Sequence, residues 1–145
     1  MADTAEVAEV LGGRQALRTA PRTTAEWQAV LKRGVPVQSA EALKRRIAIG
    51  DDVLAGLLGV SEKTLSRARA AHARLDPVAS DRLFRVARIG ALAIEVLEGE
   101  APAMRWLKRP QIGLGGSTPL ALLTTDVGCA EVEKLLLRIE HGVYS

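Results

Sequence analysis

One stretch constrains the fold of this chain more than any other: residues 51–70, DDVLAGLLGVSEKTLSRARA. It is typical of two short helices joined by a tight turn, because Gly59 can adopt the left-handed backbone conformation that such a turn needs. Ala55 leaves room for the helices to approach closely, and Ser61 is placed to cap the second one. Apolar residues at helical spacing fill the wedge between them: Leu54, Leu58, Val60 and Leu65. This spacing predicts a helix-turn-helix, whose second helix enters the major groove of DNA.

The outward face of the second helix carries the predicted DNA contacts. With Leu65, Ala68 and His72 turned inward, a step of about 100° per residue leaves a polar and basic face outside. Cationic side chains there can meet phosphates, and serine, arginine or lysine can reach base edges. The predicted DNA-binding residues are Ser61, Glu62, Lys63, Ser66, Arg67 and Arg74. The alternative is an ordinary pair of antiparallel helices with a solvated charged face.

The composition favours helices and permits a nucleic-acid partner without requiring one. The 145 residues are 48% hydrophobic and only 3% aromatic, and the formal net charge is +3. This length suits one domain or two small ones with a modest core. We therefore expect an all-α protein with a mildly basic surface.

The residues that could carry other chemistry are few. A single cysteine excludes an internal disulfide, and we expect Cys129 to pack rather than to react. The two histidines, His72 and His141, are too far apart in sequence to suggest a metal site, and no catalytic constellation is recognisable. The glycine loop at residues 112–116 lacks the ending of a phosphate-binding loop. We expect no enzyme activity, no metal and no cofactor.

Helices are predicted along the whole chain. We expect a cytoplasmic location, because no segment is apolar enough to be a leader or to span a membrane. Thr23 and Glu26 form a capping box that opens a helix ending near Gly34, and Ser39 is expected to cap the next one. Arginines 14, 18 and 22 are expected in a less regular, solvated segment. Further helices are expected over residues 4–11, 77–97, 102–109, 120–123 and 126–141. Asp76 is expected to cap the helix over 77–97, with Pro77 at its first position, and the apolar stretch 89–97 is expected to be buried on several sides.

The C-terminal third contains two distinctive segments, LGGSTPL at residues 114–120 and RIEHGVYS at residues 138–145, with Trp106, Pro110, Gly128, Val132 and Leu136 between or before them. Together these residues resemble the toxin-binding domain of Xre/MbcA/ParS antitoxins. The helix-turn-helix ahead of it is similar to the Xre-type DNA-binding half of the same family. The expected organisation is an N-terminal segment (1–22), an Xre-like helix-turn-helix domain (23–99) and a small helical toxin-binding domain (100–145).

The resemblance implies an antitoxin of a bacterial type II toxin–antitoxin pair. Its expected partners are a RES-domain toxin that depletes NAD, operator DNA in its own operon, and a second copy of the chain, since one helix-turn-helix reads only a half-site. The tail after Gly142 is predicted to enter or cover the active site of the toxin; the alternative is that it is frayed, as chain ends commonly are. The predicted toxin-binding residues are Leu114, Gly115, Gly116, Arg138, Glu140, Gly142, Val143, Tyr144 and Ser145.

A second class of function remains open at this point. A stand-alone transcription regulator could use its C-terminal part to sense a small ligand or to dimerise. Such a regulator would bind its operator alone and would have no toxin gene beside its own. An enzyme is disfavoured, because no nucleophile or acid–base constellation is recognisable.

Overall fold

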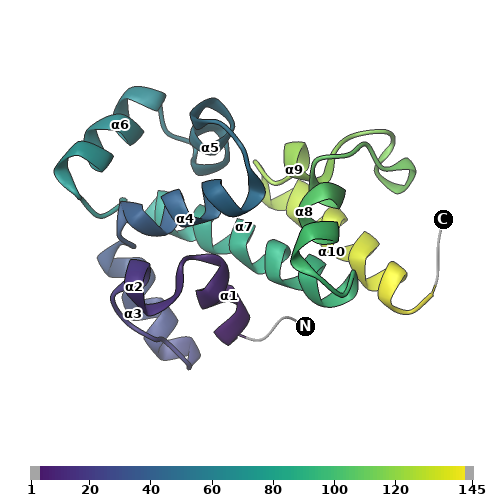
Figure 1. Cartoon of the computed structure of the whole chain (residues 1–145), viewed down its shortest axis with the longest axis horizontal. Helices are drawn as coiled ribbons and strands as arrows, with labels where there is room; N and C mark the ends of the chain where they lie inside the picture. The colour runs from purple at the N-terminus through teal and green to yellow at the C-terminus, as the bar shows by residue number, and fades with distance from the viewer. Residues whose placement is uncertain (1–3, 143–145) are drawn as a thin grey trace.

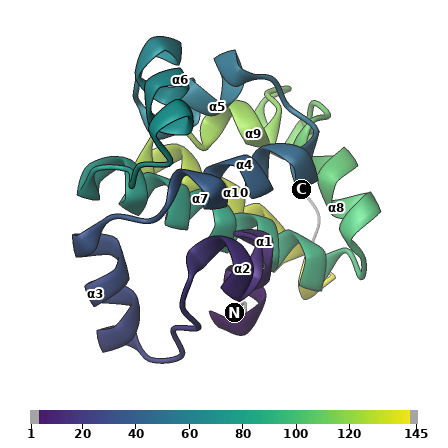
Figure 2. The ribbon, with the colours of Figure 1, turned by 60° about the vertical axis from the view of Figure 1, so that its left-hand side comes forward.

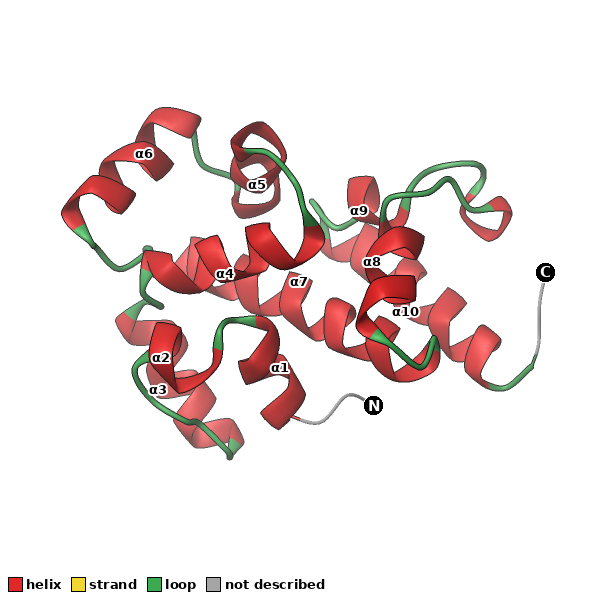
Figure 3. Cartoon of the chain, viewed as in Figure 1, coloured by secondary structure: helices red, strands yellow, loops and turns green. Residues whose placement is uncertain are grey.

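The computed structural model describes residues 4–142, and its regular structure there is helical (Figure 3). An isolated antiparallel bridge between Pro36 and Arg74 is its only extended pairing within those residues. The all-α prediction is confirmed. The helices are α1 Thr4–Val10, α2 Gly13–Leu17, α3 Thr24–Arg33, α4 Val37–Ile47, α5 Asp51–Leu58, α6 Glu62–Ala71, α7 Pro77–Val96, α8 Glu100–Leu107, the 3-10 turn η1 Ile112–Leu114, α9 Pro119–Leu122 and α10 Asp126–Glu140. None of the helices in these residues is long and apolar enough to cross a membrane.

The long helix α7 runs through the middle of the molecule (Figures 1 and 2). It begins as the sequence predicts: Asp76 accepts a hydrogen bond from the amide of Ala79 at 2.8 Å, and Pro77 occupies the first turn. Helices α1, α3 and α5 contact it from the N-terminal part of the chain, and α8 and α10 contact it from the C-terminal part. One continuous apolar core therefore runs from α1 to α10.

The second half of α7 is buried on opposite sides, as its nearly uniform apolar composition predicts. Gly90 faces α1, since a Cβ built on it would lie 3.8 Å from Val10. Two residues earlier, Arg88 points the other way and pairs with Glu133 of α10. Two side chains separated by two helical steps face nearly opposite directions, so α7 is sandwiched between α1 and α10.

The helix-turn-helix forms where it is predicted. Gly59 ends α5 with φ at 70°, and the amide of Val60 donates to the carbonyl of Ala55 at 3.0 Å. Ser61 caps α6 by accepting a hydrogen bond from the amide of Thr64 at 3.0 Å. The turn needs glycine for this left-handed conformation, and a side chain at position 59 would also displace the guanidinium of Arg82.

Two local expectations in the N-terminal part are wrong. The segment expected to be irregular contains α2, because Gly12 takes φ 91° and turns the chain directly into another helix whose Leu17 is buried. Ser39 does not cap α4, which begins two residues earlier after Pro36 and leaves Ser39 buried inside it. The capping box of Thr23 and Glu26 is confirmed at the start of α3.

The C-terminal helices are short and individually capped. Thr118 and Thr125 cap α9 and α10 through their hydroxyl groups, with donor–acceptor distances of 3.2 and 3.0 Å. Helix α8 begins at Glu100, two residues before the predicted start at Pro102. Gly128 allows α10 to pass so close to α9 that a Cβ would overlap the carbonyl oxygen of Leu122.

Candidate DNA-binding face and toxin-binding surface

Helix α6 presents an exposed polar face to solvent. Leu65, 1% exposed, is its one buried residue. The side chains of Ser61, Glu62, Lys63, Ser66 and Arg67 are exposed around it, as predicted. Among residues 4–142, neither Lys63 nor Arg67 has an ion-pair partner, so both charges are available to phosphates.

The other end of this face differs from the prediction. Helix α6 ends at Ala71, and His72 caps it in the left-handed conformation with φ 50°. His72 is exposed rather than turned inward, and its Nδ1 lies 3.1 Å from the side-chain nitrogen of Gln38. Because the helix has already ended, Arg74 lies beyond the face of α6, and its guanidinium donates to the carbonyl of Gly34 at 2.8 Å.

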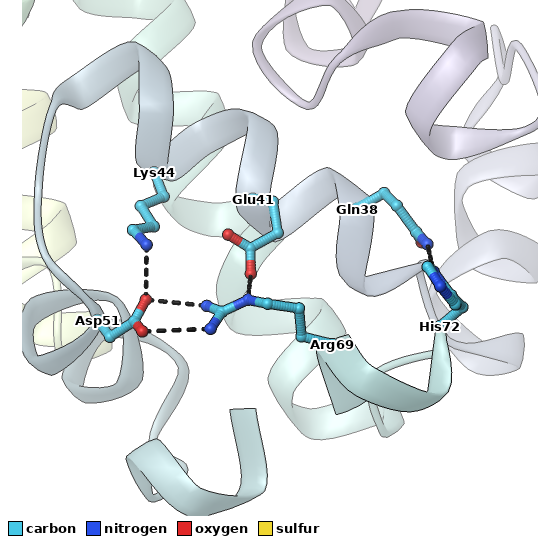
Figure 4. A network of polar contacts seen from close by, with 6 residues as sticks. All are labelled: Gln38, Glu41, Lys44, Asp51, Arg69 and His72. Atoms are coloured by element: carbon cyan, nitrogen blue, oxygen red, sulfur yellow. Dashed lines mark hydrogen bonds and ion pairs between the residues drawn. The ribbon is translucent and has the colours of Figure 1, made fainter. Parts of the chain in front are cut away.

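A network of charged residues fastens α6 to α4 and α5 (Figure 4). The guanidinium of Arg69 binds both carboxylate oxygens of Asp51, at 2.9 and 3.3 Å, and also contacts the carboxylate of Glu41. The ammonium group of Lys44 lies 2.8 Å from Asp51. The network therefore links the recognition helix to both helices behind it, and Arg69 holds it from the side opposite the exposed cations.

The same contacts shift the pKa values of the network. The hydrogen bonds from Arg69 and then Lys44 hold the pKa of the Asp51 carboxyl below its ordinary value, because they favour its charged form. Asp51 and then Glu41 raise the pKa of Arg69. Sequence reasoning missed Arg69, because its partners lie 18 and 28 positions away along the chain.

The basic run before the helix-turn-helix is largely occupied by ion pairs. Lys44 joins the network just described, and Arg46 lies 2.6 Å from Glu100 at the start of α8. Arg45 is exposed between them. Of the three residues, Arg45 alone keeps an unpaired charge within residues 4–142 that could reach phosphate.

The predicted toxin-binding loop is a closed turn at the far end of the molecule from α6 (Figure 1). The amide of Gln111 donates to the carbonyl of Ser117 at 3.0 Å, and that of Gly116 donates back to Gln111 at 2.9 Å. Gly115 and Gly116 have φ values of 65° and 87° and no neighbouring atom where a Cβ would stand. Leu114 is half-buried against the core. The loop is therefore held in shape at its base and open at its tip.

The end of α10 carries the remaining predicted residues. Arg138 is half-buried, and Glu140 is exposed at the end of the helix. Gly142, which follows the C-cap residue His141, takes φ 74° in the left-handed region. Val143, Tyr144 and Ser145 lie outside the described residues, so tail insertion stays a prediction.

Two exposed apolar side chains near this end were missed by the sequence reasoning. Ile112 is 93% exposed beside the glycine loop, and Val127 is 76% exposed in the first turn of α10. An isoleucine flanking a glycine turn is a signal that could have been noticed. Cys129 is buried, and burial raises the pKa of its thiol, so it packs in the core as predicted. Residues 4–142 contain no group of three or more metal-ligating side chains.

The described chain thus joins a helix-turn-helix, whose Lys63 and Arg67 have no ion-pair partner within residues 4–142, through α7 to a small helical unit with an open glycine loop. Residues 26–88 match the family model of the antitoxin Xre-like helix-turn-helix domain, and residues 92–142 match that of the antitoxin Xre/MbcA/ParS C-terminal toxin-binding domain. The chain belongs to the Xre family of antitoxins.

Curated relatives align with most of the length of this chain. It is 30% identical to Antitoxin Xre of Photorhabdus laumondii over 118 residues, covering 81% of this chain and 80% of the relative. It is 31% identical to Antitoxin Xre of Yersinia enterocolitica over 116 residues, covering 79% and 78%. A Prs ADP-ribosylating antitoxin of a Sphingobium strain is 31% identical over 128 residues, covering 80% and 79%.

Proposed function

We propose that this antitoxin neutralises a RES-domain toxin that depletes NAD, and that it represses its own operon by binding operator DNA as a homodimer. The observation that carries the proposal is the pair of adjacent family matches, one to a DNA-binding domain and one to a toxin-binding domain. Operator binding implies action in the cytoplasm, where bacterial DNA lies. The protein binds its partners and catalyses no reaction.

DNA recognition in this proposal falls to the exposed face of α6. Lys63 and Arg67 have no partner among the described residues, and Ser66 lies between them on the same helix. Lys63 and Arg67 supply charge for phosphates or base edges, and Ser66 can donate or accept a hydrogen bond. Ser61 and Glu62 flank this contact at the N-terminus of the helix. Two copies are needed because each helix-turn-helix reads one half-site.

Operator affinity of a Lys63→Ala/Arg67→Ala variant, measured by gel shift at fixed salt, tests this part. If Arg67 reads a base, its loss costs about 1–3 kcal/mol of binding free energy, which is roughly ten- to hundredfold in affinity. The matched control is Arg105→Ala/Lys108→Ala on the far side of the molecule, which removes the same charge. Unchanged affinity in the α6 variant would refute DNA recognition by this face.

Toxin neutralisation is assigned to the glycine loop and the end of α10. Gly115 and Gly116 leave the tip of the loop open to a partner, and Ile112 beside it offers apolar area. From the sequence, Tyr144 is an aromatic anchor and the terminal carboxylate of Ser145 suits an arginine that otherwise holds the pyrophosphate of NAD. Arg138 and Glu140 would reinforce the contact from the helix.

Deletion of residues 143–145 tests which surface inhibits the toxin. If the tail enters the active site, the shortened antitoxin still binds the toxin through the loop but no longer prevents NAD consumption. Full inhibition by the shortened chain would refute insertion and transfer the role to residues 114–119. The complementary variant is Gly115→Ala/Gly116→Ala, which strains the loop and leaves the tail intact.

A second candidate for the toxin chemistry comes from the Sphingobium relative, whose name refers to ADP-ribosylation of Prs. The two toxins are distinguished by the products formed from NAD. A toxin that only depletes NAD consumes it without a protein acceptor, whereas an ADP-ribosylating toxin attaches the ADP-ribose to Prs.

A stand-alone regulator is excluded if the protein encoded beside this gene co-purifies with the chain and arrests growth when expressed alone.

A further inference from the structure

Three arginines that are far apart in sequence surround one hollow next to the end of α6. Arg18 follows α2, Arg33 is the last residue of α3, and Arg74 lies between α6 and α7. The hollow has a volume of about 150 Å³ and is lined by these arginines together with Thr19, Leu17 and Val30. We call it the arginine hollow.

The backbone around Arg74 is locked in place. The amide of Leu75 donates to the carbonyl of Val35 at 2.8 Å, and the amide of Val37 donates to that of Ala73 at 3.0 Å. The guanidinium of Arg74 donates one hydrogen bond to Gly34, which leaves most of its five donors free. One wall of the hollow is therefore preformed.

The other two arginines stand on fixed ends of helices. Arg18 caps α2 in the left-handed conformation, with φ 67°, and its amide donates to the carbonyl of Arg14 at 2.8 Å. Arg33 is held by α3, whose Trp27 is buried with its ring 4.9 Å from that of Phe84 on α7. The two helix ends converge on the hollow without a direct hydrogen bond between them.

The charge of the arginine hollow is uncompensated. Within residues 4–142, no carboxylate lies at ion-pair distance from Arg18, Arg33 or Arg74. Cations that line one hollow repel one another, and an anion bound there offsets that repulsion. Guanidinium groups match the tetrahedral oxygens of phosphate with paired hydrogen bonds, and the hydroxyl of Thr19 can add another.

We propose that the arginine hollow holds a backbone phosphate of DNA beside the groove that α6 enters. The proposal rests on the proposed DNA binding by α6. Arg74 is two residues beyond His72, the C-cap of α6, and α2 and α3 lie at the same end of the molecule as α6 (Figure 1). In homeodomains, a variant of the helix-turn-helix, the C-terminal end of the recognition helix and a neighbouring loop contact the DNA backbone.

This contact should carry no sequence information. The lining between the arginines is apolar, from Leu17 and Val30, and offers few groups that could read a base edge. Phosphate binding by the arginine hollow should therefore contribute equally to operator and to unrelated DNA, whereas contacts from the exposed face of α6 should distinguish them.

The test is an Arg18→Ala/Arg33→Ala variant, with Arg74 kept because it bonds to the backbone. Affinity is measured for the operator and for a random duplex across a salt series. Loss of one phosphate contact should weaken both complexes by the same factor and reduce the magnitude of the slope of log K against log salt by about 1. The Arg105→Ala/Lys108→Ala control should leave the slope unchanged.

An Arg18→Lys/Arg33→Lys variant separates charge from geometry. It keeps the positive charge, so the salt slope should remain near that of the original chain, while the loss of the paired donors weakens binding. Equal thermal midpoints for the variants and the original chain establish that all are folded. A variant with alanines at both positions that retains the original affinity and slope on both duplexes overturns the proposal.

Three further outcomes are decisive. If inorganic phosphate alone binds the original chain and the alanine variant abolishes that binding without affecting DNA, the arginine hollow is a small-anion site and the proposal is wrong. If the original chain binds neither duplex, the proposed operator binding is wrong, and the phosphate contact that rests on it is wrong as well. A loss confined to the operator would also contradict the proposal, because a phosphate contact cannot recognise sequence.

Discussion

Replacing Leu65 by alanine should release the recognition helix from the rest of the molecule. Leu65 is 1% exposed and is the one buried residue of α6. Helix α6 packs mainly on α4 and α5, where Ala68 is only partly buried, so Leu65 is its main apolar anchor beside the ion pairs of Arg69. Removing three carbons from a buried leucine and leaving a cavity costs about 2–5 kcal/mol. We expect about 3 kcal/mol, because the site lies near the surface and can partly collapse.

Urea unfolding and hydrogen exchange measure this effect separately. The free energy of unfolding should fall by about 3 kcal/mol, and the amides of α6 should exchange faster than those of α7. Leu65→Met is the matched control, since a swap that conserves volume costs less than about 1.5 kcal/mol. A loss below about 1 kcal/mol in the alanine variant, with unchanged exchange in α6, would refute the view that this side chain anchors the helix.

Three other predictions concern the Asp51–Arg69 ion pair, the contact between α9 and α10, and the separation of the chain after Gly99. Arg69 lowers the pKa of Asp51, so their ion pair stabilises the fold above the ordinary carboxyl pKa of 3.8. This stabilisation is lost as the pH falls through the lowered pKa. Asp51→Asn should therefore flatten the fall in thermal midpoint between pH 6 and pH 2. Gly128→Ala should destabilise the protein by about 1–3 kcal/mol through overlap with the backbone of α9, whereas Gly56→Ala, at an open helical position, should be neutral or stabilising in the same urea titration. A chain of residues 1–99 should lose toxin binding and also self-associate in gel filtration, because it leaves one side of α7 uncovered; a monomeric fragment with the thermal midpoint of the whole chain would contradict this.

The elements that the sequence predicted best are those with local chemical causes. The turn at Gly59, the caps at Ser61 and Asp76 and the capping box at Thr23 each depend on atoms within four residues, so their spacing is visible in the chain itself. Ser39 shows the limit of this reasoning. A serine before an apolar run suggests a cap, but Pro36 starts the helix earlier, and the serine becomes part of the core.

The parts of the site that were missed depend on contacts between distant residues. The attachment of α6 through Arg69 joins three helices, and the arginine hollow joins residues separated by 15 to 56 positions. Helical periodicity also extended the α6 face to Arg74, although the chain leaves the helix at Ala71. Periodicity describes the face of a helix but contains no information on where tertiary packing ends it.

The helix α7 links the two binding functions through stability. It supports α5 of the helix-turn-helix and α10 of the toxin-binding unit at once, and Arg88 pairs directly with Glu133. A partner that binds only the folded state stabilises that state by mass action. Because α7 belongs to the core of both units, a toxin that binds the folded C-terminal unit opposes unfolding of the helix-turn-helix as well. The unbound antitoxin is then the form whose DNA-binding face is most easily lost, and DNA binding should persist longest in the complex with the toxin.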